Sequence, residues 1–317
     1  MSNPLVLIIT LNYNQSRMTI DCVNSIINSG YNNYKIIVVD NGSIKEELEY
    51  LLSNINSCVF VKEVQNNRGY VGGINIGFKE AEKYHPDYFM IMNNDTILDD
   101  QAIENLVDSG ERFNRNAIIS GKVYHFDKPN TIQYIGSIFS DRRYLKEIYP
   151  YKNEEDVGQC DVEKEMDMLD DIFWLIPNKI FNEVGFYSDN FFIYSEQGDY
   201  ALRAVRKKFK LIYNPNAKIW HKGSITTGNG DGFSPVVNFW RFKGGLIYLY
   251  RNTKKKFFYF KLIKTLPKLL LKNIFNFIGI RKSENKKSDY AALIGYIYGI
   301  KWIFNKKPDT GYNPFIK

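Results

Sequence analysis

Short apolar runs alternate with amphipathic stretches along the first half of the chain. The apolar runs stop at polar or glycine-rich segments and predict buried strands, whereas apolar residues that recur every three or four positions predict helices. The expected strands are residues 5–10, 35–40, 59–64 and 88–92, and the expected helices are residues 18–28, 46–53, 72–84 and 102–112. This alternation predicts an α/β fold with a mostly parallel, mixed sheet and helices on both faces.

Polar side chains gather where the expected strands end. Ligands of open α/β sheets bind beyond the carboxyl ends of the strands. Here those ends are residues 10–14, 40–43, 66–73 and 93–96, all polar or glycine-rich. The sequence therefore predicts a ligand site along this edge.

The second half of the chain changes in character. Residues 120–165 look irregular, and readable blocks follow at 167–178, 191–206 and 210–221. A glycine-rich, flexible loop is expected at 228–232, and helices at 238–250, 257–280 and 289–304, with a kink at Pro267. We predict an α/β domain that carries this ligand edge over residues 1–235 and a basic amphipathic helical region over 236–317.

Charge is distributed unevenly along the 317 residues. Residues 241–317 carry 18 basic and three acidic side chains, a net charge of +15, whereas the remaining residues carry −8. A solvated lysine-rich surface is one interpretation, and an anionic partner, either membrane or nucleic acid, is the other. Only three histidines and three widely spaced cysteines occur, so a metal site would have to rely on carboxylates.

Two segments at the expected ligand edge could bind phosphate or metal. Asp95 ends the run YFMIMNND. One carboxylate at this place, with phosphate oxygens and water, can hold Mg²⁺ or Mn²⁺. The alternative is that Asp95 only forms an Asx turn that closes the strand. Residues 66–73 (NNRGYVGG) place glycines and Arg68 before a helix, which suits phosphate or a plain loop. Neither GxGxxG nor GxxxxGK(S/T) is present, so dinucleotide and P-loop sites are not predicted.

Two later segments carry further candidates. Glu196 and Asp199 follow an aromatic run, as a general base beside a sugar pocket would, or as acids that complement a helix dipole. His221 ends a short expected strand at 218–221, and an isolated histidine is more often structural than a ligand.

Six ordered motifs resemble the family 2 glycosyltransferases with the GT-A fold, most closely the rhamnosyltransferase-like branch. They span about the first 225 residues. They are IITLNYN (8–14), IIVVDNGS (36–43), NNRGYVGGINIGFKEA (66–81), MNNDT (92–96), FFIYSEQGDYALRA (191–204) and NPNAKIWHKGS (214–224).

The resemblance implies roles for individual residues. Asp95 and His221 would bind a divalent metal, Mg²⁺ or Mn²⁺, and Asp167, Asp171 and Trp174 would lie near the donor sugar and acceptor. Asp171 and Ile172 stand where the family usually has Gly-Ala, which bears on donor identity. The residues implied to bind the nucleotide sugar are Thr10, Asn12, Asp40, Arg68, Gly72, Gly73, Asn94 and Asp95.

The family has two adjacent acids where this chain has Glu196-Gln197, and the second acid is the usual base. A neutral amide cannot accept the acceptor's proton. Either Gln197 is a deliberate change from glutamate, or the chain is natural and Glu196 or Asp199 serves. We favour Glu196 in the natural case.

The resemblance implies an inverting, metal-dependent transferase that moves a sugar from a nucleoside-diphosphate donor to a hydroxyl of a growing cell-surface glycan, free or lipid-linked. We expect dTDP-rhamnose first and a UDP-hexose next. A processive synthase would need spanning helices and a QxxRW stretch, which the sequence lacks. A catalytically silent sugar-binding or assembly protein is the other alternative.

The basic tail, with its interleaved apolar residues, predicts a cytoplasmic protein held peripherally on the inner, anionic face of the cell membrane. The longest uncharged apolar stretch, residues 290–300, is about half the ~20 residues of a spanning helix. The family supplies no nucleic-acid role, so that partner is not expected. A homo-oligomer is left open.

Overall fold

The computed structural model describes residues 3–223, 234–280 and 285–316. The expected loop at 228–232 lies outside these residues. The chain forms two compact units, the first of residues 1–138, 148–187 and 200–223, the second of 139–147, 188–199 and 224–317. Each is described by itself below, and the domain boundary at 235/236 stays a prediction.

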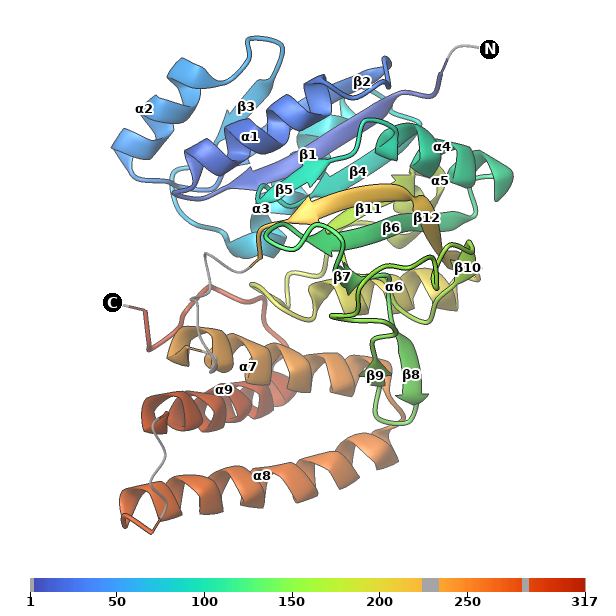
Figure 1. Ribbon diagram of the computed structural model, residues 1–317. Helices are drawn as coiled ribbons and strands as arrows, with labels where there is room; N and C mark the ends of the chain where they lie inside the picture. Colours follow the sequence, from blue (N-terminus) through green and yellow to red (C-terminus); the bar gives the residue numbers. More distant parts are fainter. Residues whose placement is uncertain (1–2, 224–233, 281–284, 317) are drawn as a thin grey trace. The chain divides into compact units, whose positions relative to one another are not determined.

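A ten-stranded mixed sheet forms the centre of the first unit, in the order β10-β12-β6-β11-β4-β1-β2-β3, with β5 on β12 and β7 on β6 (Figure 1). Neighbouring strands among β4, β1, β2 and β3 are parallel, as are β6 and β12, whereas β11 runs antiparallel between β4 and β6. The predicted mostly parallel, mixed sheet is thus confirmed. The strands are β1 (Val6–Asn12), β2 (Tyr34–Asp40), β3 (Phe60–Glu63), β4 (Tyr88–Met92), β5 (Thr96–Leu98), β6 (Ala117–His125), β7 (Ile132–Tyr134), β10 (Lys164–Glu165), β11 (Phe173–Pro177) and β12 (Lys210–His221).

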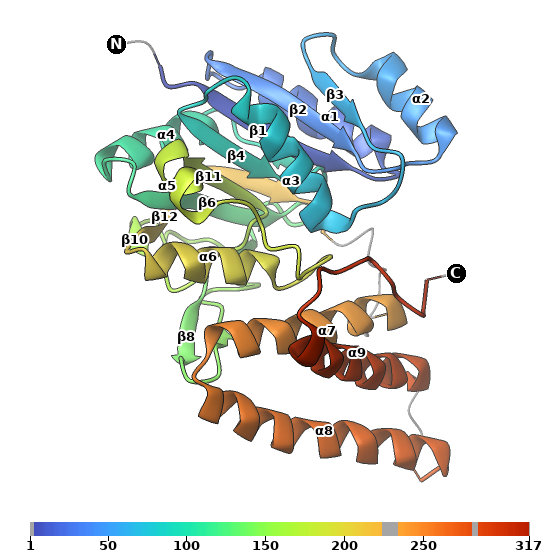
Figure 2. The same cartoon turned by 180° about the vertical axis from the view of Figure 1, so that it is seen from behind.

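Helices cover both faces of this sheet, because apolar side chains of its central strands alternate between the two. On one face, Val23 of α1 and Leu106 of α4 join the same core cluster as Ile8 of β1 (Figure 1). On the other face lie α3 and α5 (Figure 2), where a Cβ added at Gly77 would lie 2.3 Å from Ile9 Cγ2. The helices that begin in or belong to this region are α1 (Ser16–Ile27), α2 (Lys45–Asn54), α3 (Gly69–Glu82), α4 (Ala102–Arg112), α5 (Asn178–Val184) and α6 (Glu196–Arg206).

The sequence missed one central strand. Residues 120–165 were expected to be irregular, but β6 (Ala117–His125) is almost wholly buried between β11 and β12. The register between β12 and β6 shifts between Asn214 and Lys218, and this bulge lies over Gly121. A Cβ on Gly121 would lie 2.0 Å from the carbonyl oxygen of Ala217, so the glycine makes room for the bulge.

Three helices and a hairpin form most of the described part of the second unit. The predicted helices appear as α7 (Pro235–Asn252), α8 (Lys255–Phe277) and α9 (Lys286–Asn305), and Pro267 lies inside α8. Their shared core includes Leu246 of α7, Phe258 and Leu269 of α8, and Tyr296 of α9. The hairpin joins β8 (Ile138–Asp141) to β9 (Lys146–Ile148).

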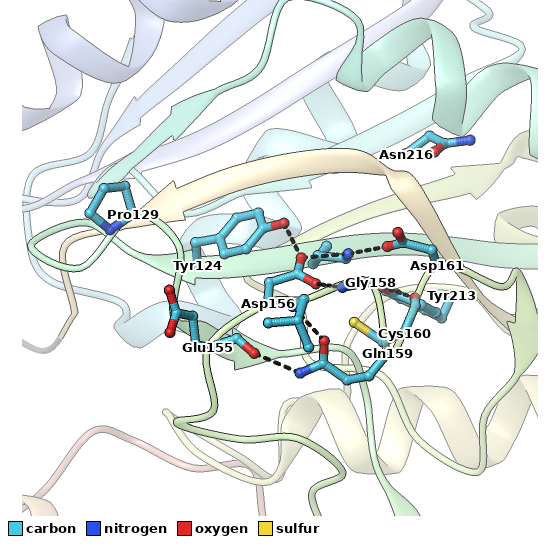
Figure 3. A network of polar contacts seen from close by, with 12 residues as sticks. Tyr124, Pro129, Glu155, Asp156, Gly158, Gln159, Cys160, Asp161, Tyr213 and Asn216 are labelled. Atoms are coloured by element: carbon cyan, nitrogen blue, oxygen red, sulfur yellow. Dashed lines mark hydrogen bonds and ion pairs between the residues drawn. The ribbon is translucent and has the colours of Figure 1, made fainter.

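β6 is buried although it contains a charged residue, Lys122, because that lysine has acidic partners. Its side chain is 2% exposed, and Nζ lies 2.7 Å from both Asp156 Oδ2 and Asp161 Oδ1. The Tyr124 hydroxyl also donates to Asp156, within the network drawn in Figure 3. Although Asp156, Cys160 and Asp161 could each offer a ligand atom within 4.8 Å of one another, the Lys122 ammonium already forms an ion pair with each of the two carboxylates. The cluster is therefore an ion-pair network that holds residues 156–161 onto β6.

We expect Lys122→Met to lower the free energy of unfolding by about 3–5 kcal/mol, because it leaves buried acid uncompensated. Burial alone would raise the pKa of Asp156, but hydrogen bonds from Lys122 and Tyr124 lower it overall. This stabilisation is complete above the unfolded aspartate pKa of about 3.9 and is lost as pH falls through the folded value.

Urea unfolding at neutral pH, repeated toward acid pH, measures both effects. Lys45→Met is the matched control, since Lys45 and Glu49 form an exposed pair at 3.6 Å that should contribute less than about 1 kcal/mol. Equal losses for the two variants would contradict the role given to Lys122.

Candidate functional site

A chain of buried hydrogen bonds joins the carboxyl ends of β2, β1 and β4. Asn12 Nδ2 donates to Asp40 Oδ2 at 2.7 Å, and the Thr19 hydroxyl donates to Asn12 Oδ1 at 2.7 Å. Asn94 Nδ2 in turn donates to Thr19 Oγ1 at 2.9 Å. The structure thus brings together three of the predicted nucleotide-site residues, Asn12, Asp40 and Asn94. Thr19, on the first turns of α1, is the link that sequence reasoning missed.

Asp40 is itself held by the residues that follow it. The Ser43 hydroxyl donates to Asp40 Oδ2 at 2.6 Å, and the Ser43 backbone N–H donates to Oδ1 at 3.1 Å. Thr10 lies on β1 two residues before Asn12 and is fully buried. Its Oγ1 makes no hydrogen bond with the described residues. An unpaired buried hydroxyl is uncommon.

Asn41 fixes the loop before α3. Its Nδ2 donates to Asn67 Oδ1 at 3.1 Å and to the Gly69 carbonyl at 3.0 Å, while its Oδ1 accepts from the Arg68 backbone N–H at 3.0 Å. Gly42 has φ +81°, and a Cβ there would lie 2.7 Å from the Asn66 and Asn67 backbone. The loop is therefore tied to the end of β2, and Arg68 keeps an exposed position on it.

Gly72 and Gly73 lie in α3, where close packing accounts for at least one of them. A Cβ added at Gly73 would lie 2.2 Å from Leu11 Cδ1, so this glycine lets α3 approach β1. A Cβ at Gly72 would lie 2.6 Å from Arg68 Cβ. The predicted donor contact of both glycines stays a prediction.

Asp95 and His221 meet through the pairing of β5 with β12. His221 is opposite Thr96, and the Lys222 backbone N–H donates to the Asp95 carbonyl at 2.8 Å. Asp95 Oδ1 and His221 Nε2 lie 3.2 Å apart, with side chains 13% and 12% exposed. A carboxylate and an imidazole nitrogen that converge in this way are suitable ligands for a divalent cation.

The segment before β11 runs beside the end of β4. The Asn93 backbone N–H donates to the Ile172 carbonyl at 2.9 Å, so Asp171 lies next to the carboxyl end of β4. Asp171 is buried and accepts a 2.7 Å hydrogen bond from the Tyr187 hydroxyl. Burial, helped by the charge of Asp170, raises the pKa of the Asp171 carboxyl well above its ordinary value.

The other two residues predicted near the donor sugar and acceptor are placed differently. Trp174 lies within β11 and is fully buried, with its ring centroid 6.1 Å from that of Tyr200, so its ring packs inside the protein. The Asp167 backbone N–H donates to the Ser137 carbonyl at 3.1 Å, and this side chain is only half-buried.

The three candidate bases begin α6, after two residues in the left-handed region, Tyr194 (φ 69°) and Ser195 (φ 74°). Glu196 is buried, and Gln197 Oε1 is buried without a hydrogen bond to the described residues. Non-glycine residues with positive φ carry strain that is frequent at functional sites.

Asp199 has firm partners, and all of them belong to the same unit as Asp199 itself, the second. Arg251 Nε lies 2.7 Å from Asp199 Oδ1 and Arg251 Nη2 lies 3.2 Å from Oδ2, while Asn252 Nδ2 donates to Oδ1 at 3.0 Å. A buried carboxylate that a bidentate arginine and an amide hold in place has a structural role. This geometry favours Glu196 over Asp199 among the two acids.

Three comparisons bear on this arrangement. Poly-beta-1,6-N-acetyl-D-glucosamine synthase of Staphylococcus aureus (strain COL) is 22% identical over 210 residues, 66% of this chain and 47% of the synthase. An uncharacterized glycosyltransferase of Haemophilus influenzae is 31% identical over 106 residues, 33% of this chain and 32% of that protein. The chain thus spans about half the length of the synthases it matches.

The structural likeness agrees with the sequence likeness. The crystal structure of GalNAc-T7 with UDP, GalNAc and Mn²⁺ matches with a TM-score of 0.59 at 15% identity, over 74% of this chain and 47% of that one. The predicted GT-A fold is confirmed by this likeness. A model of glycosyl transferase family 2 matches residues 7–185, more than half of the chain, and the protein therefore belongs to glycosyl transferase family 2.

Proposed function

We propose that the protein is an inverting glycosyltransferase that takes its sugar from a nucleoside-diphosphate donor. The observation that carries this proposal is the placement of Asp95 and His221, 3.2 Å apart. They lie at the same end of the sheet as the series of hydrogen bonds that links Asp40 to Asn94. Family membership and the names of the relatives support sugar transfer.

The hydrogen-bonded polar side chains at the strand ends would bind the nucleotide. Asp40 and Asn12 would accept and donate hydrogen bonds at the ribose and base. The Thr10 hydroxyl, which has no hydrogen-bond partner among the described residues, would be a further contact. Asn94 would lie near the ribose. Arg68, exposed on its loop, would add positive charge near the donor.

Asp95 and His221 would hold Mg²⁺ or Mn²⁺, and the bound cation would supply positive charge that stabilises the diphosphate leaving group. Each of these two side chains keeps about one eighth of its surface exposed, so solvent can still reach the pair. Asp171, next to the β4 edge, would face the donor sugar or acceptor.

We propose dTDP-rhamnose as the first donor to test, because the motifs resemble the rhamnosyltransferase-like branch. A UDP-hexose is the alternative, and the poly-N-acetylglucosamine synthase and the UDP-bound GalNAc-T7 are relatives that favour testing it. The acceptor would be a hydroxyl of a growing cell-surface glycan, free or lipid-linked.

The acceptor hydroxyl must lose its proton as it attacks, so the reaction needs a base. We propose that position 196 or 197 supplies it. Gln197 Oε1, buried and without a donor among the described residues, could accept a hydrogen bond from the hydroxyl but could not take its proton. Glu196 is the base if glutamine is the natural residue at 197.

We further propose that α8 holds the protein on an anionic membrane surface at the cytoplasmic face. One face of α8 packs through Phe258 and Leu269 on the other helices of its unit. Another face exposes apolar side chains at spacings of three and four, with Ile263 72% and Phe277 91% exposed. The residues of this exposed apolar face are Phe260, Ile263, Leu270, Leu271, Ile274 and Phe277.

Charge complementarity favours a lipid surface as the occupant of this face. Exposed Lys261, Lys264 and Lys268 follow α8 at the same spacing as the apolar residues and border them. Helices that lie in the membrane interface combine such an apolar face with neighbouring lysines. Within the part of the chain that the structure describes, every helix is too short or too polar to span a bilayer.

Asp95→Ala should abolish sugar transfer and donor hydrolysis, because the divalent cation loses a ligand. The same variant should lose the Mn²⁺-dependent part of the melting-temperature rise that we expect with dTDP, UDP or GDP, since a ligand of the folded state raises that temperature. Asp40→Ala should instead weaken nucleotide binding.

Asp100→Ala, an exposed acid in the same segment, is the control and should behave as the unchanged protein. Full activity of Asp95→Ala, or full activity of the unchanged protein in excess chelator, would refute the metal site. Donor binding without any transfer or hydrolysis by the unchanged protein would favour a catalytically silent binding protein instead.

Gln197→Glu should raise the transfer rate by about 10²–10⁴-fold if position 197 is the base position, which is the usual contribution of a positioned base. Initial rates with matched donor and acceptor measure this, and Gln159→Glu serves as a control for an added carboxylate elsewhere. An unchanged rate, with activity lost in Glu196→Gln, would assign the base to Glu196.

Replacing two exposed residues of α8, Ile263→Glu with Phe277→Glu, should abolish binding to vesicles that contain anionic phosphatidylglycerol. Each lysine near such a surface contributes about 1 kcal/mol, so added salt should also weaken binding. Co-sedimentation of the full chain measures the bound fraction.

Val157→Glu makes the same change at a valine that is 80% exposed outside the helices, and it should leave vesicle binding intact. Equal binding of the double variant and the unchanged protein would rule out the α8 face. A concentration-dependent dimer that the double variant dissolves would identify a second copy as the occupant instead.

A further inference from the structure

A row of side chains behind His221 reaches from β12 through β7 and β6 to a neighbouring loop. His221 Nδ1 lies 2.6 Å from Gln133 Oε1, and Gln133 Nε2 lies 3.4 Å from His125 Nδ1. His125 Nε2 lies 2.9 Å from Asn153 Oδ1. Gln133 is buried, and all four residues belong to the first unit.

Each contact in this row has a defined direction. An amide oxygen can only accept, so His221 Nδ1 must carry the proton that it shares with Gln133 Oε1. An amide nitrogen can only donate, so His125 Nδ1 must accept from Gln133 Nε2, which leaves the His125 proton on Nε2. That proton points to Asn153 Oδ1, an acceptor, so the last contact agrees with the first two.

The direction of the row decides what His221 presents to Asp95. With its proton on Nδ1, neutral His221 turns the lone pair of Nε2 toward Asp95 Oδ1, 3.2 Å away. Two electron-pair donors that face each other gain nothing from direct contact, but both can bind one cation. Histidine ligands of metals ordinarily donate their other ring N–H to such an acceptor.

We propose that Gln133 is a positioning residue that fixes His221 in the Nδ1–H tautomer and so keeps Nε2 available as a ligand for the divalent cation. This inference rests on the proposed metal site, but the tautomer can be observed without metal. His125 and His221 take opposite tautomers because one amide faces both rings.

Long-range ¹H–¹⁵N correlation spectra of the metal-free chain test the tautomers directly. The chain has only three histidines, so His85→Gln and His125→Gln variants assign the signals. At alkaline pH, where free imidazole is neutral, we expect His221 protonated on Nδ1 and His125 on Nε2. A His221 proton on Nε2 would overturn the proposal.

Two substitutions separate positioning from packing. Gln133→Met keeps the length of the side chain but removes the acceptor, so it should release the His221 tautomer and weaken Mn²⁺ binding by about 10–100-fold. Gln133→Glu restores an acceptor at Nδ1 and should retain both the tautomer and the affinity. Loss of the free Mn²⁺ EPR signal, with and without UDP, measures affinity independently of turnover.

Gln159→Met is the control, since its amide bonds to the Glu155 carbonyl away from this row, and it should change neither readout. Unchanged Mn²⁺ affinity in Gln133→Met, or equal loss in Gln133→Met and Gln133→Glu, would refute the positioning role. Unchanged Mn²⁺ affinity in Asp95→Ala would instead refute the proposed metal site, whatever tautomer His221 adopts.

Discussion

The candidate site depends on one constraint, that buried polar groups at the end of an apolar sheet must satisfy one another. Asn12 and Asp40 end strands whose central residues, 6–9 of β1 and 36–39 of β2, are apolar and buried. Unpaired, each would cost about 1–3 kcal/mol of desolvation. Hydrogen bonds through Thr19 and Ser43 remove this cost and, at the same time, fix the carboxylate and amides in one arrangement. The geometry that could recognise a nucleotide is thus the one that makes burial tolerable.

The sequence predicted those parts of the fold whose signal is local. Strand 88–92 and helix 102–112 match the structure to the residue, because each has an uninterrupted apolar run or a clear helical period. β6 was missed because Ser120, Gly121 and Lys122 interrupt its apolar pattern. The partners that allow Lys122 to be buried, Asp156 and Asp161, follow more than thirty residues later, and no local pattern shows them.

The candidate site shows the same division. Asp40 ends β2, and Asn94 and Asp95 come just after β4, so their common edge could be predicted from strand order alone. Thr19 and Gln133 could not be found in this way, since their importance arises from contacts with residues that are distant in the sequence or on other elements. Gly73 shows the opposite limit, because a glycine read as a phosphate contact also has a packing function against Leu11.

The bulge in β12 divides the strand into a part that packs in the core and a part that carries His221. Residues before it, from Lys210 to Asn214, keep their register with β6 in the core, whereas Lys218 to His221 pair with β6 and β5 in a new register. Side chains alternate along a strand, so losing or gaining one residue in the bulge would turn His221 to the opposite face of the sheet. The pairing of residues 210–214 with β6 lies before the bulge and could keep its register. During divergence of such proteins, a single-codon insertion or deletion here could therefore remove the proposed metal ligand while residues 210–214 keep their pairing with β6.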